Sequence, residues 1–130
     1  MTNRRTFILS GAALTSAVIA GPLLAAGHGR IGTFHGQSGH KAQGRVEIVT
    51  HGGKTTLDLL DDFVFDGAPD PKLAFGNNGF DQSTVFTKLN SNSGKQIYEV
   101  PAGIDASAMN EVWIWCEQYS VPLGVAKLDH

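Results

Sequence analysis

The sequence predicts an all-β protein, folded as one small β-sandwich or partly open barrel of about seven or eight short, mostly antiparallel strands. Three observations favour this class. Glycines recur between short apolar stretches along most of the chain, which is typical of strands joined by turns. Apolar and polar residues alternate with a period of two in several of these stretches. No long helical period interrupts them.

The first expected strand is GTFHG, residues 32–36. A hairpin follows over residues 44–60, where Val46 and Ile48 alternate with other side chains. Between its strands, Gly52-Gly53 supply the positive φ angles that a tight primed turn requires. This segment is therefore the clearest local prediction of a strand pair.

The second half of the chain alternates breakers with short apolar runs. Asp66-Gly67 and the prolines after it predict a loop between Phe65 and Lys72. The elements expected after this loop are a strand at 72–75, a loop at 76–86, a strand at Gln96–Val100, an irregular link at 102–110 with one helical turn, and a last strand pair at 111–119 and 121–128.

The N-terminus has the composition of an export signal. Arg4 and Arg5 precede Phe7 and a weakly apolar run rich in small residues, as in the leaders read by the bacterial twin-arginine exporter. The run ends in small residues that predict cleavage after Ala26 or Gly27. An uncleaved membrane anchor is the alternative, because the run is long enough to span a bilayer.

Cleavage divides the chain into a twin-arginine signal peptide, residues 1–27, and one domain, residues 28–130. The expected location is the periplasm or the medium, with membrane contact only through the signal segment if it stays attached. Removing residues 1–27 removes two of the ten basic residues and none of the 12 acidic ones, which leaves a formal net charge of −4. With no basic stripe, nucleic acid is not an expected partner.

Several segments carry a resemblance to a known family. These are GTFHG, GRVEIV, LDLLDDFVFDGAPDPKL, LNSNSGKQIYEVP and VWIWCEQYSVPLGVAKL. Together they resemble the DM13 domain, a small extracytoplasmic all-β module, over roughly residues 32–128. The most specific piece runs from Ile114-Trp115-Cys116 to Gly124-Val125-Ala126-Lys127-Leu128. The spacing from Gly94 through Tyr98 to Pro101 is the next most specific.

The resemblance implies a role in electron transfer, for which the family's cysteine is a proposed bare thiol or a ligand to a prosthetic group such as haem. That cysteine is Cys116 here, and a redox partner protein is the implied partner. Trp113, Trp115, Tyr98 and Gly124 are the expected neighbours of the site. No cofactor is specified beyond haem or a metal ion.

The residues themselves leave the role of Cys116 open. Alternation puts Val112, Ile114 and Cys116 on one face of a strand, and Trp113 and Trp115 on the other. A free cysteine among aliphatic side chains is often an inert core residue. A reactive thiol needs a nearby cation, helix N-terminus or metal, and the adjacent Glu117 would oppose thiolate formation.

The remaining candidate is a weak metal site. His35 and His40 flank the loop GQSG, and two imidazoles on one loop can bind copper or zinc. The alternative is that these are surface histidines at polar turn positions. No nucleophile–base or acid–base set can be assembled from the motifs, so an enzyme is not expected.

The sequence therefore predicts an exported redox domain acting through Cys116. The first alternative is a structural or protein-interaction module in which Cys116 is a core residue. The second is a small-ligand or metal-binding protein that uses His35 and His40.

Overall fold

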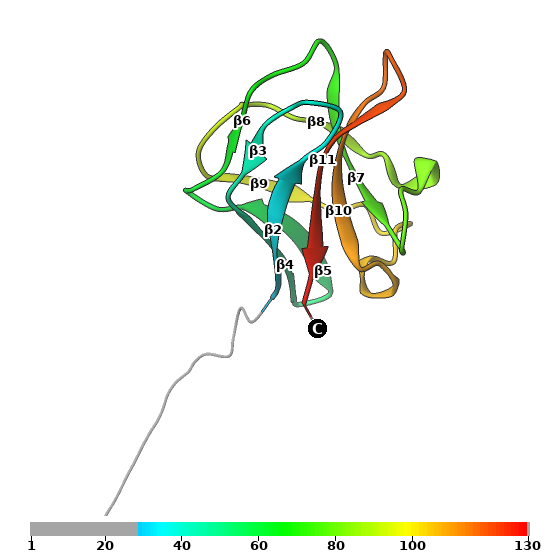
Figure 1. Ribbon diagram of the computed structural model, residues 1–130. Coiled ribbons are helices and arrows are strands. Elements are labelled where there is room, and N and C mark those ends of the chain that lie inside the picture. Colours follow the sequence, from blue (N-terminus) through cyan, green and yellow to red (C-terminus); the bar gives the residue numbers. More distant parts are fainter. Residues whose placement is uncertain (1–28, 130) are drawn as a thin grey trace, which may run out of the picture.

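The computed structural model describes residues 29–129, which form one antiparallel eight-stranded sheet and one two-stranded sheet (Figure 1). The order in the larger sheet is β8-β7-β10-β11-β2-β4-β5-β9, and β3 pairs with β6. The larger sheet curls until it is nearly closed into a barrel. The predicted all-β fold class is confirmed. The strands are β2 (Arg30–Gly36), β3 (Ala42–Gln43), β4 (Arg45–His51), β5 (Lys54–Leu59), β6 (Val64–Phe65), β7 (Pro71–Gly76), β8 (Thr87–Lys88), β9 (Gln96–Glu99), β10 (Glu111–Cys116) and β11 (Val121–Leu128).

The predicted hairpin is β4–β5. The ladder runs from the pair Val46–Leu59 to the pair His51–Lys54. Gly52 and Gly53 connect the strands with φ angles of 61° and 82°, the two positive values of a primed turn. The expected alternation is also confirmed, because the apolar side chains of both strands are buried at every second position.

The two-residue strands and the helix η4 were not predicted from the sequence, whereas the one helical turn expected in the link at 102–110 is present. β3 and β8 lie in stretches without an alternating pattern. The expected loop at 76–86 contains the 3-10 helix η4 (Gln82–Thr84), and the expected link at 102–110 contains η5 (Ala106–Ala108). In each helix an aspartate, Asp81 or Asp105, accepts a hydrogen bond from a backbone N–H as an N-cap. No helix among the described residues has the length and apolar composition needed to span a membrane.

The hydrophobic core fills the inside of the curled sheet. Phe34 and Phe63 meet edge to face at its centre, with ring centroids 5.5 Å apart. Residues from nearly every strand complete it; the largest fully buried ones are Phe34, Phe63, Phe75, Leu57, Leu59, Leu73, Ile114, Leu123, Val46, Val112 and Cys116. The core therefore reaches the end of β10, where the cysteine lies.

β10 is held on both sides, by β7 and by β11. Its ladder with β11 slips by one residue, because Ile114 pairs with Gly124 while Trp115 pairs with Pro122. Leu123 is the extra residue of this bulge, and its side chain is buried. Proline cannot donate to a ladder, so a bulge is a position where a strand accepts it. β10 ends at Cys116, three residues earlier than predicted, because the turn begins at Glu117.

Candidate functional site

Cys116 is the last residue of β10 and faces the core. Its backbone pairs with Pro71 of β7 on one side and Val121 of β11 on the other. The residue is a free cysteine with 1% of its surface exposed. It shares the inner face with Val112 and Ile114, as the alternation predicted. In this arrangement the sulfur packs as a core atom.

An exposed turn begins one residue after the buried thiol. Residues 117–120 are all exposed, and Tyr119 is 61% exposed. Ser120 has a φ of 54°, a left-handed conformation that is uncommon for residues other than glycine. Solvent therefore lies within one residue of Cys116 along the chain.

An ion-pair cluster, which we call the latch, ties this turn to β7. Lys72 Nζ lies 2.6 Å from Glu117 Oε1 and 3.6 Å from Asp70 Oδ1. The Glu117 backbone N–H also donates to the Asp70 carbonyl over 3.2 Å. The hydrogen bond to Glu117 raises the pKa of Lys72 above its ordinary value. The charge of Glu117, which would oppose thiolate formation, is thus paired.

The two tryptophans of β10 lie on the outer face of the sheet, opposite the cysteine. Phe80 stacks on Trp115 with centroids 3.7 Å apart and ring planes 6° apart. Phe80 also meets Trp113 edge-on at 6.2 Å. The Trp115 Nε1 atom is buried and has no hydrogen-bond partner among residues 29–129. The aromatic cluster thus lies beside Cys116 in sequence but on the other side of the strand.

Glu111 is a buried acid that the sequence analysis missed. Only 4% of its surface is exposed. Its Oε1 accepts hydrogen bonds from the Gly79 N–H at 2.8 Å and from Trp113 Nε1 at 3.1 Å. Its Oε2 lies 3.9 Å from Lys127 Nζ. A glutamate at an outward strand position is expected to be exposed, so the alternation along β10 did not indicate a buried acid. Glu111 is buried because the loop between β7 and η4 covers it.

Tyr98 supports the fold on a strand removed from Cys116 in the sheet order, whereas Gly124 pairs with Ile114, two residues before Cys116. The Tyr98 hydroxyl accepts from the Asn90 N–H at 3.0 Å and bonds Gln96, and burial raises the pKa of Tyr98. In the sheet order, four strands separate β9, which carries Tyr98, from β10. A Cβ atom on Gly124 would come within 2.9 Å of the Ala42 side chain. Gly124 therefore lets β3 pack closely over β11.

The two predicted metal-binding histidines have different surroundings. His35 is exposed on the outer face of β2. His40 Nδ1 lies 2.9 Å from Asp66 Oδ1, and its ring stacks on Phe65. Residues 29–129 contain no group of three or more His, Cys, Asp or Glu side chains placed to hold a metal ion. A metal site at His35 and His40 stays a prediction, and the contacts of His40 with Asp66 and Phe65 hold two segments of the fold together.

The His40–Asp66 pair predicts a small acid-dependent loss of stability. The hydrogen bond from His40, together with the Lys41 N–H, lowers the pKa of Asp66. A lowered pKa stabilises the fold above the unfolded-state value near 4, and this contribution disappears as the pH falls through the folded-state value. Because the pair is partly exposed, we expect roughly 0.5 kcal/mol or less. Urea unfolding at pH 6 and pH 3 should show a larger loss for the wild type than for Asp66→Asn; equal losses would contradict this assignment.

The family is identified by comparison with known proteins. The family described as Electron transfer DM13 matches residues 33–128, which covers most of the chain, from the middle of β2 to the end of β11. The chain belongs to the DM13 family. No curated protein and no solved structure matches it significantly. The expected signal peptide, with Arg4, Arg5 and Phe7, lies outside the described residues.

The cysteine of this DM13 domain does not fit a haem or metal ligand in the described arrangement. A ligating sulfur needs an open position beside it, and Cys116 is closed in by the core. Cys116 does not line any of four prominent pockets in the part of the chain that the structure describes. No His, Cys, Asp or Glu cluster accompanies it there. The bare thiol is therefore the form of the redox hypothesis that we pursue.

Proposed function

We propose that this DM13 domain is an exported electron-transfer protein that acts through Cys116 as a bare thiol. The family description supports the electron-transfer role. We assign the electron-transfer role to Cys116 because it is the only cysteine of the chain and lies next to an exposed turn. The paired arginines near the N-terminus support export, which brings the thiol into an oxidising compartment.

A single cysteine restricts the chemistry to exchange with another molecule. The Cys116 thiol loses its proton and its sulfur attacks a disulfide of a redox partner. The partner's S–S bond breaks, a mixed disulfide to Cys116 forms, and the departing partner sulfur takes up a proton as a thiol. The Cys116 sulfur is oxidised and the departing sulfur is reduced. A second thiol from outside this chain must then release Cys116.

This chemistry requires the turn after Cys116 to open while the core stays folded. The latch of Lys72, Glu117 and Asp70 is the contact that opposes opening. Local openings of this kind have free energies below that of global unfolding. Exposed turns with few buried contacts are the segments where they occur.

Loosening the latch should expose the thiol. We expect Lys72→Met to raise the rate at which a thiol reagent labels Cys116 in the folded protein by about two- to fivefold. Methionine keeps the aliphatic stem and removes the charge. Lys54→Met is the matched control, since Lys54 forms an exposed pair with Glu99 at 3.9 Å between β5 and β9. Equal rates in both variants would contradict gating by the latch.

The burial of Cys116 favours a second candidate function. With 1% of its surface exposed, the cysteine can be a packing residue of a protein-interaction or ligand-binding module without redox chemistry. Labelling only upon global unfolding would support this module. A visible absorption band that disappears in Cys116→Ser would instead show a bound prosthetic group and overturn the bare-thiol proposal.

A further inference from the structure

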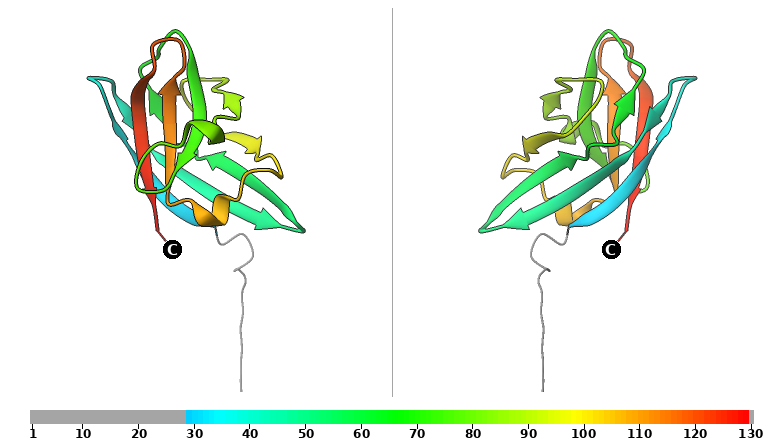
Figure 2. Two further views of the ribbon diagram at one scale, coloured as in Figure 1. Left: turned by 90° about the vertical axis from the view of Figure 1, so that its right-hand side faces the viewer. Right: turned by 90° about the vertical axis from the view of Figure 1, so that its left-hand side faces the viewer.

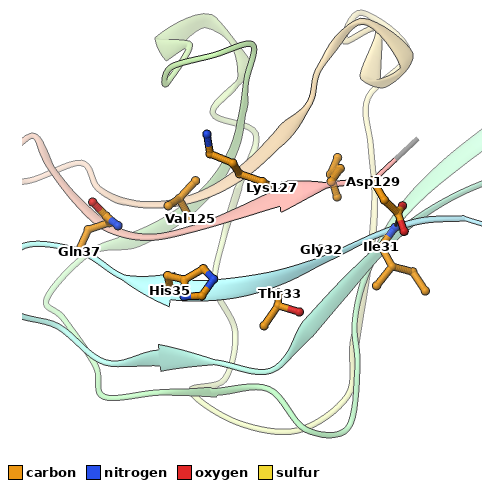
Figure 3. A pocket seen from close by; sticks show the side chains of 9 residues that line it. Ile31, Gly32, Thr33, His35, Gln37, Val125, Lys127 and Asp129 are labelled. Atoms are coloured by element: carbon orange, nitrogen blue, oxygen red, sulfur yellow. Dashed lines mark hydrogen bonds between the residues drawn. The ribbon is translucent and has the colours of Figure 1, made fainter.

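A groove of about 710 Å³ lies on the outer face of the sheet, over β2 and β11. Its volume is within the range of small-molecule sites. Figure 3 shows the side chains of Thr33 and His35 along β2 and those of Val125 and Lys127 along β11. The groove is on the opposite face of the sheet from Cys116, so binding in the groove is independent of the redox proposal.

The sheet register arranges these side chains in rows. His35 is opposite Val125, and Thr33 is opposite Lys127. Directly opposed residues in antiparallel strands have Cβ atoms about 5 Å apart, so one small molecule can touch both rows. On the next strand, Trp113 is opposite Val125. The row of His35 and Val125 therefore continues to the indole ring of Trp113. The row of Thr33 and Lys127 carries the positive charge of the groove.

The groove is rich in hydrogen-bond donors that have no partner. Within the described part of the chain, the side chains of Thr33, His35 and Gln37 make no hydrogen bond. Lys127 is 80% exposed, and its nearest acid, Glu111, is 3.9 Å away, beyond hydrogen-bond distance. This concentration of donors stands out in a chain with more acidic than basic residues.

The acidic residue at the end of the groove, Asp129, already accepts a hydrogen bond through its carboxylate. Asp129 Oδ1 accepts the Ile31 N–H at 2.7 Å. Its charge disfavours a second anion at this end and leaves the position between Lys127 and Thr33 as the favourable one. An apolar body attached to that anion would extend over Val125, on the side away from Asp129.

We infer that this groove binds a small organic anion, a carboxylate or sulfonate with a compact apolar body. Lys127 and Thr33 hold the anionic group through a charge-assisted and a neutral hydrogen bond. Val125 and the stem of Lys127 cover the apolar body, and His35 and Gln37 offer further donors at its edge.

The test uses two dyes that differ in one group. The aromatic sulfonate 8-anilinonaphthalene-1-sulfonate is titrated into the purified protein, with emission and calorimetry as readouts. Its neutral analogue N-phenyl-1-naphthylamine lacks the sulfonate. We expect saturable one-to-one binding of the sulfonate and at least about tenfold weaker binding of the neutral dye, the loss typical of a charge-assisted contact.

Three variants separate the anion site from general dye binding. Lys127→Gln should weaken sulfonate binding about tenfold, whereas Lys95→Gln, at an exposed lysine outside the groove, should not change it. Glu111→Gln removes the competing charge beside Lys127 and should tighten sulfonate binding about two- to threefold without changing binding of the neutral dye, whereas loosened packing would raise the binding of both dyes. Equal binding by Lys127→Gln and Lys95→Gln, equal affinity for both dyes, or no saturable binding would each overturn the inference.

Discussion

Phe63→Ala should lower the free energy of unfolding by about 3–5 kcal/mol and leave the native labelling rate of Cys116 unchanged. The Phe63 side chain is fully buried and packs edge to face on Phe34. Its truncation removes the transfer free energy of the ring and leaves a cavity. This loss is a large part of the 5–15 kcal/mol typical of a whole domain. Urea unfolding followed by tryptophan emission measures it.

The labelling rate decides between the two candidate functions. If Cys116 reacts through opening of its turn while the core stays folded, a cavity at Phe63 leaves the rate within about twofold. If Cys116 reacts only after global unfolding, the same variant accelerates labelling by roughly two to three and a half orders of magnitude. Phe63→Leu makes the same comparison with a smaller loss of stability, should the alanine variant fail to fold. Acceleration in proportion to lost stability would leave the interaction module as the better function.

Glu111→Ala should lower the free energy of unfolding by about 2–4 kcal/mol. The Glu111 carboxylate accepts the Gly79 N–H and the Trp113 indole N–H in a buried position. Each buried donor left without a partner costs about 1–3 kcal/mol. The loop bearing Phe80 should also loosen from the tryptophans and shift their emission to longer wavelength.

Two matched variants test this reason for the loss. Glu111→Gln keeps an oxygen that can accept both hydrogen bonds, so it should retain most of the stability. Glu99→Ala removes an exposed glutamate whose partner, Lys54, is 3.9 Å away, and it should change stability by less than about 0.5 kcal/mol. A loss as small in Glu111→Ala as in Glu99→Ala would contradict a buried hydrogen-bond role.

Local sequence patterns predicted the parts of this fold that depend on backbone angles in a turn or on side-chain alternation within a strand. Gly52-Gly53 specify the β4–β5 turn because few other residues adopt two successive positive φ angles. Alternation along β10 placed Cys116 on the inner face before its surroundings were known. Both results depend on spacing within one or two strands, which the sequence displays directly.

The candidate sites depended on contacts between distant segments, which a single sequence does not reveal. Glu111 is buried by a loop more than 30 residues earlier in the chain. The latch pairs Lys72 of β7 with Glu117 in the turn after β10. The groove exists because the first and last described strands, β2 and β11, are neighbours. The contact of His40 with Asp66 joins segments 26 residues apart, and the sequence gives no sign of it.

Because β2 and β11 are neighbouring strands, one end of the domain carries both chain ends and the opposite end carries the Cys116 turn. The backbone of Asp129 bonds that of Ile31, so both ends of the described chain leave the domain at one pole (Figure 2). The turn after Cys116 lies at the other end of β11, roughly 20–25 Å away for a strand of eight residues. Anything fused or tethered through either terminus would therefore leave the Cys116 turn pointing outward, free to meet a second molecule.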